Sequence, residues 1–289
     1  NLVADAKGGH IQPVLGVGLE TELTETIAEA LQGYRGMGPV RIGNQAHEHF
    51  QHDTYGNIIL GAAPAFFDKR LFMNTGKAAF EHLEALGEQA WLLHDQPDAG
   101  LWELRSRSRI HTSSSLMCWV ACDRLGKIAA HLGLAKRATY WTERADIIRA
   151  KILERTWSEK RQSFVESFDG NTLDASVLLM GEVGFLPPQD PRFVATVETL
   201  SATLGRGPFM LRYEEADDFG VPEVGFNLCA FWRVDALTRI GRKEEARDLF
   251  EALLEARNPL GLMSEDTSFA TGEAWGNFPQ TYSMAGIIN

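Results

Sequence analysis

The residues of this chain that could do chemistry are carboxylates and arginines placed close to aromatic side chains. They fall in four segments, 38–46, 100–105, 211–226 and 264–280, which long helical stretches separate. The carboxylates are Glu103, Glu223, Glu265, Asp266 and Glu273, the guanidinium groups are Arg41, Arg105 and Arg212, and the aromatic rings are Trp102, Tyr213, Phe226 and Trp275. Aromatic rings stack on the C–H faces of sugars and charged groups bind hydroxyls, so this set favours a carbohydrate ligand.

Hydrolysis of a glycosidic bond needs one carboxylic acid that protonates the leaving oxygen and one carboxylate that activates water. Glu103 follows Trp102 directly, and contact with an apolar ring disfavours the charged form of a carboxyl group, which suits the acid. Plainer interpretations stay open at this point. The acids could be solvated loop residues, the arginines structural ion-pair partners, and the tryptophans part of the core.

Helical periodicity dominates the elements that must position these residues. Charged amphipathic helices are expected at Lys77–His94, Lys136–Trp157, Pro191–Leu204 and Lys243–Arg257, and more apolar helices are expected to begin near Asn44, Thr112, Thr172, Gly225 and Phe278. The apolar helices start about 55 to 70 residues apart, a spacing typical of helical repeats. The pattern predicts an all-α ring of inner and outer helices, in which the loops that enter the inner helices converge at one end. A short hairpin is expected at Arg161–Phe168.

The number of expected helices indicates whether this sequence contains the whole ring. Six pairs need about one more inner helix than this sequence contains. Because the chain begins at Asn1 and not at Met, we expect the further pair upstream of residue 1. The three cysteines lie in apolar runs, which indicates buried thiols in a reducing compartment, and no targeting pattern is present, so we expect a cytoplasmic protein.

Composition excludes several classes of partner. The formal charge is −11, and Lys and Arg form no block, which argues against nucleic acid and anionic membranes as partners. No apolar run reaches the length of a bilayer span. His47, His49 and His52 do not share one helical face, so we expect solvated or capping histidines and no metal site. The apolar run Met117–Ala121, with Trp119 inside it, is predicted to lie in the core.

Several motifs along the chain carry a family resemblance. They are GYRGMGPVRIGNQA (33–46), GLWELR (100–105), MCWVACDRL (117–125), FNLCAFW (226–232), NPLGLMSED (258–266) and GNFPQTYSMAGIIN (276–289). Their shared order resembles glycoside hydrolase family fifteen, which contains glucoamylases, glucodextranases and some microbial trehalases. The resemblance implies an (α/α)6 toroid, with residues 1–289 as part of a single catalytic domain. It also implies hydrolysis at non-reducing ends with inversion of the anomeric centre, without a cofactor.

The resemblance assigns roles motif by motif. Glu103 in LWE resembles the family's general acid, and Glu265 in MSED resembles its general base, with Asp266 and Glu273 as rival bases. Arg41 and Arg212 match arginines that hold the terminal glucose. We expect the remaining substrate contacts from Trp102, Arg105, Tyr213, Glu223 and Trp275. For an inverting enzyme the two catalytic carboxyl groups are expected about 6.5–9.5 Å apart.

Departures from the family pattern leave the substrate open. The run Thr112–Ser115 stands where many bacterial members have His and Lys, and Asp266-Thr267 follows Glu265 where an acidic residue and a tyrosine are usual. Both changes bear on the subsite for the leaving group. The first expectation is an α-1,4-linked glucan or maltooligosaccharide, and the alternative is trehalose. A non-catalytic carbohydrate-binding relative is the alternative from another class, and the sequence indicates no oligomeric state.

Overall fold

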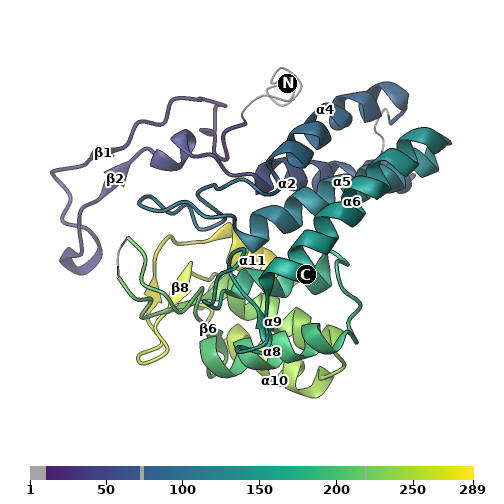
Figure 1. Ribbon diagram of the computed structural model, residues 1–289. Helices are drawn as coiled ribbons and strands as arrows, with labels where there is room; N and C mark the ends of the chain where they lie inside the picture. The colour runs from purple at the N-terminus through teal and green to yellow at the C-terminus, as the bar shows by residue number, and fades with distance from the viewer. Residues whose placement is uncertain (1–10, 72–74, 219) are drawn as a thin grey trace. The chain divides into compact units, whose positions relative to one another are not determined.

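The computed structural model describes residues 11–71, 75–218 and 220–289, and helices dominate it (Figure 1). Every strand in the described part of the chain is two residues long. The residues form two compact units: the first contains Asn1–Ile110 and Met117–Ile148, and the second contains His111–Leu116 and Arg149–Asn289. Among the described residues, no helix combines the length and the apolar character that crossing a bilayer requires. The all-α prediction is confirmed.

The core of the first unit lies where its helices meet. Its helices are α2 (Asp53–Ala62), α3 (Pro64–Phe67), α4 (Lys77–Leu93), most of α5 (Thr112–His131) and the first part of α6 (Ala135–Thr156). Helix α4 packs against α2 and buries Phe80, Leu86 and Ala90 (Figure 1). Gly87 lets α4 approach its neighbours closely, because a Cβ there would lie 2.2 Å from Leu125 and 2.8 Å from Trp141.

The segment before α2 is irregular. Strand β1 (Thr26–Ile27) pairs antiparallel with β2 (Arg41–Ile42), and the 3-10 helices η1 (Tyr34–Gly36) and η2 (Gln45–Glu48) flank β2 in sequence. The helix predicted to begin near Asn44 begins at Asp53 instead. The side chain of Asn44 accepts a hydrogen bond from the Ala46 amide at 2.9 Å and so caps only the short turn η2, after which the backbone is extended at His49.

The second unit packs several helices around α9. It contains the 3-10 helix η3 (Ala175–Leu178) and the α-helices α7 (Leu179–Glu182), α8 (Pro191–Leu204), α9 (Asn227–Arg239), α10 (Lys243–Glu255) and α11 (Thr281–Ile288). Helix α9 contacts α10, α11, α7 and α8. Helix α8 matches its predicted bounds, because Asp190 caps the amide of Arg192 at 2.9 Å and Pro191 occupies the first turn.

Short antiparallel ribbons connect these helices. Strand β3 (Trp157–Ser158) pairs with β4 (Ser163–Phe164), β5 (Gly205–Arg206) pairs with β6 (Phe209–Met210), and β7 (Gly225–Phe226), β8 (Asp266–Thr267) and β9 (Ala274–Trp275) form a three-stranded sheet. The hairpin predicted at Arg161–Phe168 therefore exists, but it begins at Trp157 and turns before Ser163.

Most helix predictions are confirmed within a few residues, but the helix expected near Asn44 begins only at Asp53 and the one expected near Thr172 does not form. The charged helices appear as α4, α6, α8 and α10, and the apolar helices near Thr112, Gly225 and Phe278 appear as α5, α9 and α11. Near Thr172 the chain forms only η3 and the four-residue α7. Asp174 caps the 3-10 turn through the Ser176 amide at 2.7 Å, and Gly184, with φ at +74°, follows α7. The run Met117–Ala121 is buried, as predicted.

Candidate functional site

In the first unit, Glu103 lies in a loop whose ends are joined by backbone hydrogen bonds. Asp98 and Arg109 exchange amide-to-carbonyl bonds of 3.0 and 3.2 Å, and inside the loop the Leu104 amide donates to the Ala99 carbonyl at 3.1 Å. The backbone of Glu103 has φ at +57°. A non-glycine residue in this left-handed region costs about 1–2 kcal/mol. Such strain is found at functional residues, which fits the predicted role of Glu103.

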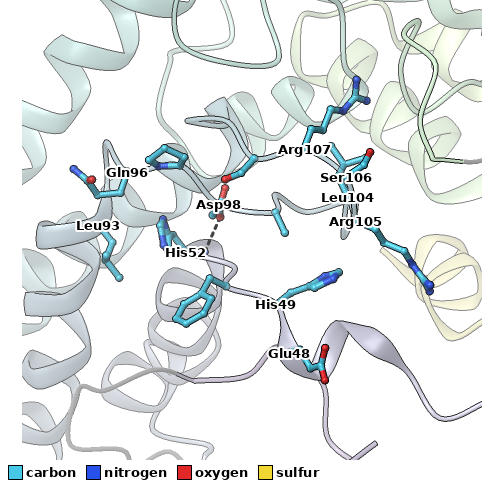
Figure 2. A pocket seen from close by; sticks show the side chains of 14 residues that line it. Glu48, His49, His52, Leu93, Gln96, Asp98, Leu104, Arg105, Ser106 and Arg107 are labelled. Carbon is cyan, nitrogen blue, oxygen red and sulfur yellow. Dashed lines mark hydrogen bonds between the residues drawn. The ribbon is translucent and has the colours of Figure 1, made fainter. Parts of the chain in front are cut away.

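The same loop is attached to the start of α2. The Ala99 amide donates to the Phe50 carbonyl at 3.0 Å, and the His52 amide donates to Asp98 Oδ2 at 2.8 Å. Figure 2 shows the Asp98 side chain pointing toward His52 along this second bond. Asp98 is 2% exposed. A buried carboxylate thus joins the loop of the predicted acid to a helix N-terminus, where the backbone amides favour negative charge.

Glu25 binds both of the arginines in the first unit that are expected to contact substrate, Arg41 and Arg105. Arg105 donates to the two oxygens of Glu25 at 3.2 and 3.0 Å and to Gln45 Oε1 at 2.8 Å. Arg41 Nε lies 2.9 Å from Glu25 Oε1. The hydrogen bond from Arg105 and the charges of both arginines lower the pKa of Glu25. Sequence reasoning missed Glu25, because it lies in none of the motifs.

A pocket of about 640 Å³ lies beside the Glu103 loop (Figure 2). It is lined by Glu48, His49, Phe50, His52, Leu93, Gln96, Pro97, Asp98, Ala99, Leu104, Arg105, Ser106, Arg107 and Ser108. Of the predicted site residues in this unit, Arg105 lines the pocket, whereas its lining does not include Arg41, Trp102 or Glu103. Trp102 and Glu103 are both partly exposed.

The histidines do not all behave as the sequence predicts. His47 Nδ1 lies 2.8 Å from the Asn44 carbonyl oxygen, which is a local contact of the expected kind. His52, by contrast, is 5% exposed, and burial lowers its pKa against the opposing charge of Asp98. His52 is therefore neither solvated nor a side-chain cap, because folding places it against the Asp98 loop. Within the ranges that the structure describes, no group of His, Cys, Asp and Glu could hold a metal ion.

In the second unit, the three-stranded sheet brings Asp266 together with two predicted aromatic residues. Phe226, Asp266 and Trp275 are direct partners across β7, β8 and β9. Asp266 is 8% exposed, and burial raises its pKa to about 7, with a further rise from Glu265 and an opposing effect of Arg212. Its Oδ1 atom has no hydrogen bond from any part of the chain that the structure describes.

Glu265 is held by backbone bonds on both sides. Its amide donates to the Asn277 carbonyl at 2.9 Å, and its carbonyl accepts from the Asn227 amide at 3.0 Å. Its Oε2 atom accepts hydrogen bonds from the backbone amide and the side-chain amide of Asn277, each at 2.9 Å. Gly276 lies against both acids, since a Cβ there would be 2.7 Å from Glu265 Oε2 and 2.9 Å from Asp266 Oδ2. The two carboxyl groups therefore approach the same point of the backbone.

The other predicted residues of the second unit differ in their surroundings. The guanidinium of Arg212 lies 5.1 Å from the centre of the Phe226 ring and 5.7 Å from that of Tyr213, which is suited to cation–π attraction. Tyr213 is buried and donates its hydroxyl hydrogen bond to Asp217. Glu223 is exposed, on the loop before β7. Arg212 lies beside Phe226, and Trp275 is the strand partner of Asp266, while the roles of Arg212, Tyr213, Glu223 and Trp275 in sugar binding stay predictions.

The predicted acid and the predicted base belong to different units, and their catalytic roles stay predictions. Glu103 belongs to the first unit and Glu265 to the second, so the predicted separation of their carboxyl groups stays a prediction. The family assignment comes from the whole chain. The sequence model of glycosyl hydrolases family 15 matches residues 9–289, and the chain belongs to this family.

The curated relatives that match this chain are named trehalases. The chain is 36% identical over 298 residues to a protein of Mycolicibacterium smegmatis named trehalase, covering 100% of this chain and 44% of that protein. It is 30% identical over 290 residues to a trehalase of Thermoplasma volcanium, covering 98% of this chain and 45% of that protein. The chain thus spans less than half the length of the curated relatives it matches.

Solved structures show the fold class. A glycosidase variant in complex with glucose superposes with a TM-score of 0.71 at 18% identity, over 88% of this chain and 71% of that one. A bacterial glucoamylase complexed with acarbose superposes with a TM-score of 0.66 at 16% identity, over 88% of this chain and 42% of that one. The fold is of the (α/α)6 class, as predicted.

Proposed function

We propose that the protein containing this chain hydrolyses trehalose to two molecules of glucose with inversion at one anomeric carbon. The observation that supports trehalose most is the 36% identity, over the full chain, to a relative named trehalase. This favours the alternative substrate of the sequence analysis over the first expectation, an α-1,4-linked glucan. The glucoamylases among the solved structures are too distant in sequence to support a substrate.

The proposed reaction uses Glu103 as general acid and Glu265 as general base. Glu103 donates its proton to the glycosidic oxygen while the bond from that oxygen to the anomeric carbon breaks. Glu265 accepts a proton from a water molecule, and the water oxygen forms the new bond to the same carbon from the opposite face. One water is consumed, and each carboxyl group ends in the protonation state in which the other began. A proton exchange with solvent restores both.

The proposed substrate contacts are the side chains that the sequence indicates, namely Arg41, Trp102, Arg105, Arg212, Tyr213, Glu223 and Trp275. Arg41 and Arg105 are pre-oriented by Glu25, which reduces the side-chain entropy lost when a hydroxyl is bound. We also propose that residues 1–289 belong to one catalytic domain, because one family model matches residues 9–289. A cytoplasmic location stays a prediction.

The product anomers test this proposal. Trehalose contains two α-linked glucose units, and an inverting attack breaks the bond at only one anomeric carbon. The first products are therefore one β-glucose and one α-glucose, which proton NMR distinguishes before mutarotation. We expect this 1:1 ratio when the full-length protein acts on trehalose, and no comparable release from maltotriose or isomaltose. Two α-glucose molecules would contradict inversion, and β-glucose from maltotriose alone would return the assignment to a glucoamylase.

Loss of the general acid separates an enzyme from a binding relative. Glu103→Gln keeps the shape of the side chain but cannot donate the proton, so we expect a fall in kcat of about 10²–10⁴-fold with trehalose binding retained. Binding by calorimetry and hydrolysis by glucose release are measured on the same preparation. Trehalose binding without hydrolysis in the folded wild-type protein would support a non-catalytic carbohydrate-binding relative.

A further inference from the structure

The loop that carries Glu103 is anchored at its base, away from Glu103 itself. Asp98 is the first residue of the loop, and its carboxylate accepts the 2.8 Å hydrogen bond from the backbone amide of His52, the residue before α2. The neighbouring Ala99 amide donates to the Phe50 carbonyl at 3.0 Å. Two hydrogen bonds thus fix consecutive loop residues on the segment that leads into α2, and Figure 2 shows the one between His52 and Asp98.

The side-chain bond of Asp98 is strong for physical reasons. Asp98 is 2% exposed and His52 is 5% exposed, so the bond is largely shielded from water. The His52 amide lies at the N-terminus of α2, where unpaired amides and the helix dipole attract a carboxylate. A charged acceptor in a buried site makes a bond about twice as strong as a neutral one. The Asp98 side chain therefore ties this loop to the start of α2.

The loop needs such an anchor because its backbone is strained. Glu103 has φ at +57°, in the left-handed region that disfavours a residue with a Cβ. A left-handed residue persists only where the surrounding structure holds it, since relaxation would otherwise recover about 1–2 kcal/mol. The Ala99 carbonyl, next to Asp98, accepts the amide of Leu104, the residue after Glu103. The path from Asp98 to the strained residue is therefore two backbone steps and one hydrogen bond.

We propose that Asp98 is a positioning residue for Glu103, holding the acid-bearing loop on the start of α2. Asp98 contacts neither reacting atom in this role and acts through the loop. The inference rests on the proposed function, in which Glu103 is the general acid.

Three substitutions at Asp98 test the role. Asp98→Ala removes the acceptor, Asp98→Glu keeps the charge but lengthens the side chain by one methylene, and Asp98→Asn keeps an oxygen of the same reach without the charge. Asp68→Asn is the charge-matched control, because Asp68 is paired with Arg70 on the surface of the same unit. Each variant is made in the full-length protein, and kcat and KM for trehalose are measured beside hydrogen exchange of the Ala99, Leu104 and His52 amides.

A positioning role predicts a split between the kinetic constants. We expect Asp98→Ala and Asp98→Glu to lower kcat about 10- to 100-fold with KM changed less than about threefold, because a misplaced acid slows the chemical step but not binding. Asp98→Asn should recover part of kcat, because it keeps an acceptor oxygen of the same reach but loses the charge. Exchange should accelerate at Ala99, Leu104 and His52 and not across the rest of the unit. If Asp98→Ala does not fold, kcat and amide exchange in Asp98→Glu and Asp98→Asn are compared instead. That comparison then decides whether Asp98 positions the loop.

Two results would overturn the inference. One is wild-type kcat and unchanged exchange in both Asp98→Ala and Asp98→Glu. The other is a uniform rise in exchange over the whole unit with kcat and KM altered together, which marks a general structural role. If the wild-type protein hydrolyses no sugar, the proposed function fails by itself. Local exchange at the three amides then still decides whether Asp98 holds the loop.

Discussion

Arg105 and Glu25, which are 80 positions apart in the sequence, form a bidentate ion pair with nitrogen–oxygen distances of 3.2 and 3.0 Å. The same carboxylate lies 2.9 Å from Nε of Arg41. Glu25 therefore organises both predicted sugar-binding arginines of the first unit. A single acid that spans two arginines fixes their planes, and a planar guanidinium must be oriented before it can bind two hydroxyls at once.

Removing the charge of Glu25 should affect binding more than stability. We expect Glu25→Gln to raise KM for trehalose several-fold, because Arg41 and Arg105 lose their common partner. The free energy of unfolding should fall by no more than about 1 kcal/mol, since the pair is near the surface. Steady-state kinetics and thermal unfolding measure the two effects. A large loss of stability with unchanged KM would show that Glu25 is a structural brace.

Glu265 and Asp266 can be told apart as the base by pH. Because the pKa of Asp266 is raised to about 7, this residue holds a proton at pH 5 and cannot take one from water. We expect Glu265→Gln to lower kcat about 10²–10⁴-fold at pH 5, and Asp266→Asn to lower it far less at the same pH. The measurement is kcat for trehalose from pH 4.5 to 8. A greater loss in Asp266→Asn at pH 5 would transfer the role of base to Asp266.

Gly276 tests whether the two acids depend on the space beside them. In Gly276→Ala the new methyl group would lie 2.7 Å from Glu265 Oε2 and 2.9 Å from Asp266 Oδ2, so we expect a fall in kcat of about 10- to 100-fold. Gly272→Ala is the control: Gly272 has φ at +73°, like +71° at Gly276, but nothing lies within 4 Å of its Cβ position. Equal losses of kcat in both variants would attribute the effect to backbone strain alone.

The buried carboxyl of Asp53 should make stability depend on pH. Burial, together with the charges of Asp98 and Glu103, raises the pKa of Asp53 from 3.8 to about 7. The unfolded chain releases this proton above pH 3.8 and the folded protein keeps it to about pH 7, so this group lowers stability progressively across that window. Asp53→Asn mimics the protonated form and should lack this loss of stability. Between pH 4 and pH 7.5, its free energy of unfolding should therefore rise by up to a few kcal/mol relative to that of the wild type.

Thermal unfolding of wild type and Asp53→Asn at both pH values measures this difference. Asn57 donates to Asp53 Oδ2 at 2.9 Å, and the substituted amide retains an oxygen for that bond. Parallel pH dependence in the two proteins would contradict a protonated Asp53 in the folded state.

Replacing two helical glycines of the first unit with alanine should change the stability of the protein in opposite directions. Gly87→Ala forces a methyl group against Leu125 and Trp141, and such overpacking costs about 1–3 kcal/mol. Gly61→Ala in α2 meets nothing within 4 Å and should stabilise the protein by about 0.5–1 kcal/mol through helix propensity. Urea unfolding measures both. Similar stability of the two variants would show that α4 is not packed tightly at Gly87.

The sequence by itself was enough for the helices whose periodicity extends over several turns. Helix α8, with Asp190 as cap and Pro191 in its first turn, has its predicted bounds, because these signals act within the segment itself. The short elements were harder to predict from the sequence. Near Asn44 and Thr172, side-chain caps stabilise 3-10 turns that compete with the expected α-helix, and an apolar pattern does not reveal which turn forms.

The candidate acid, base and arginines were proposed from motifs, since residue type and local order are properties of the sequence, and their roles stay predictions. Only the tertiary structure could decide what surrounds them. Glu25 meets Arg105, Asp98 meets His52, and Asp266 is buried between Phe226 and Trp275 because folding joins distant segments. The protonation of a carboxyl group depends on desolvation and on charges nearby in space. Those quantities arise only when the chain is packed, so no spacing in the sequence could predict them.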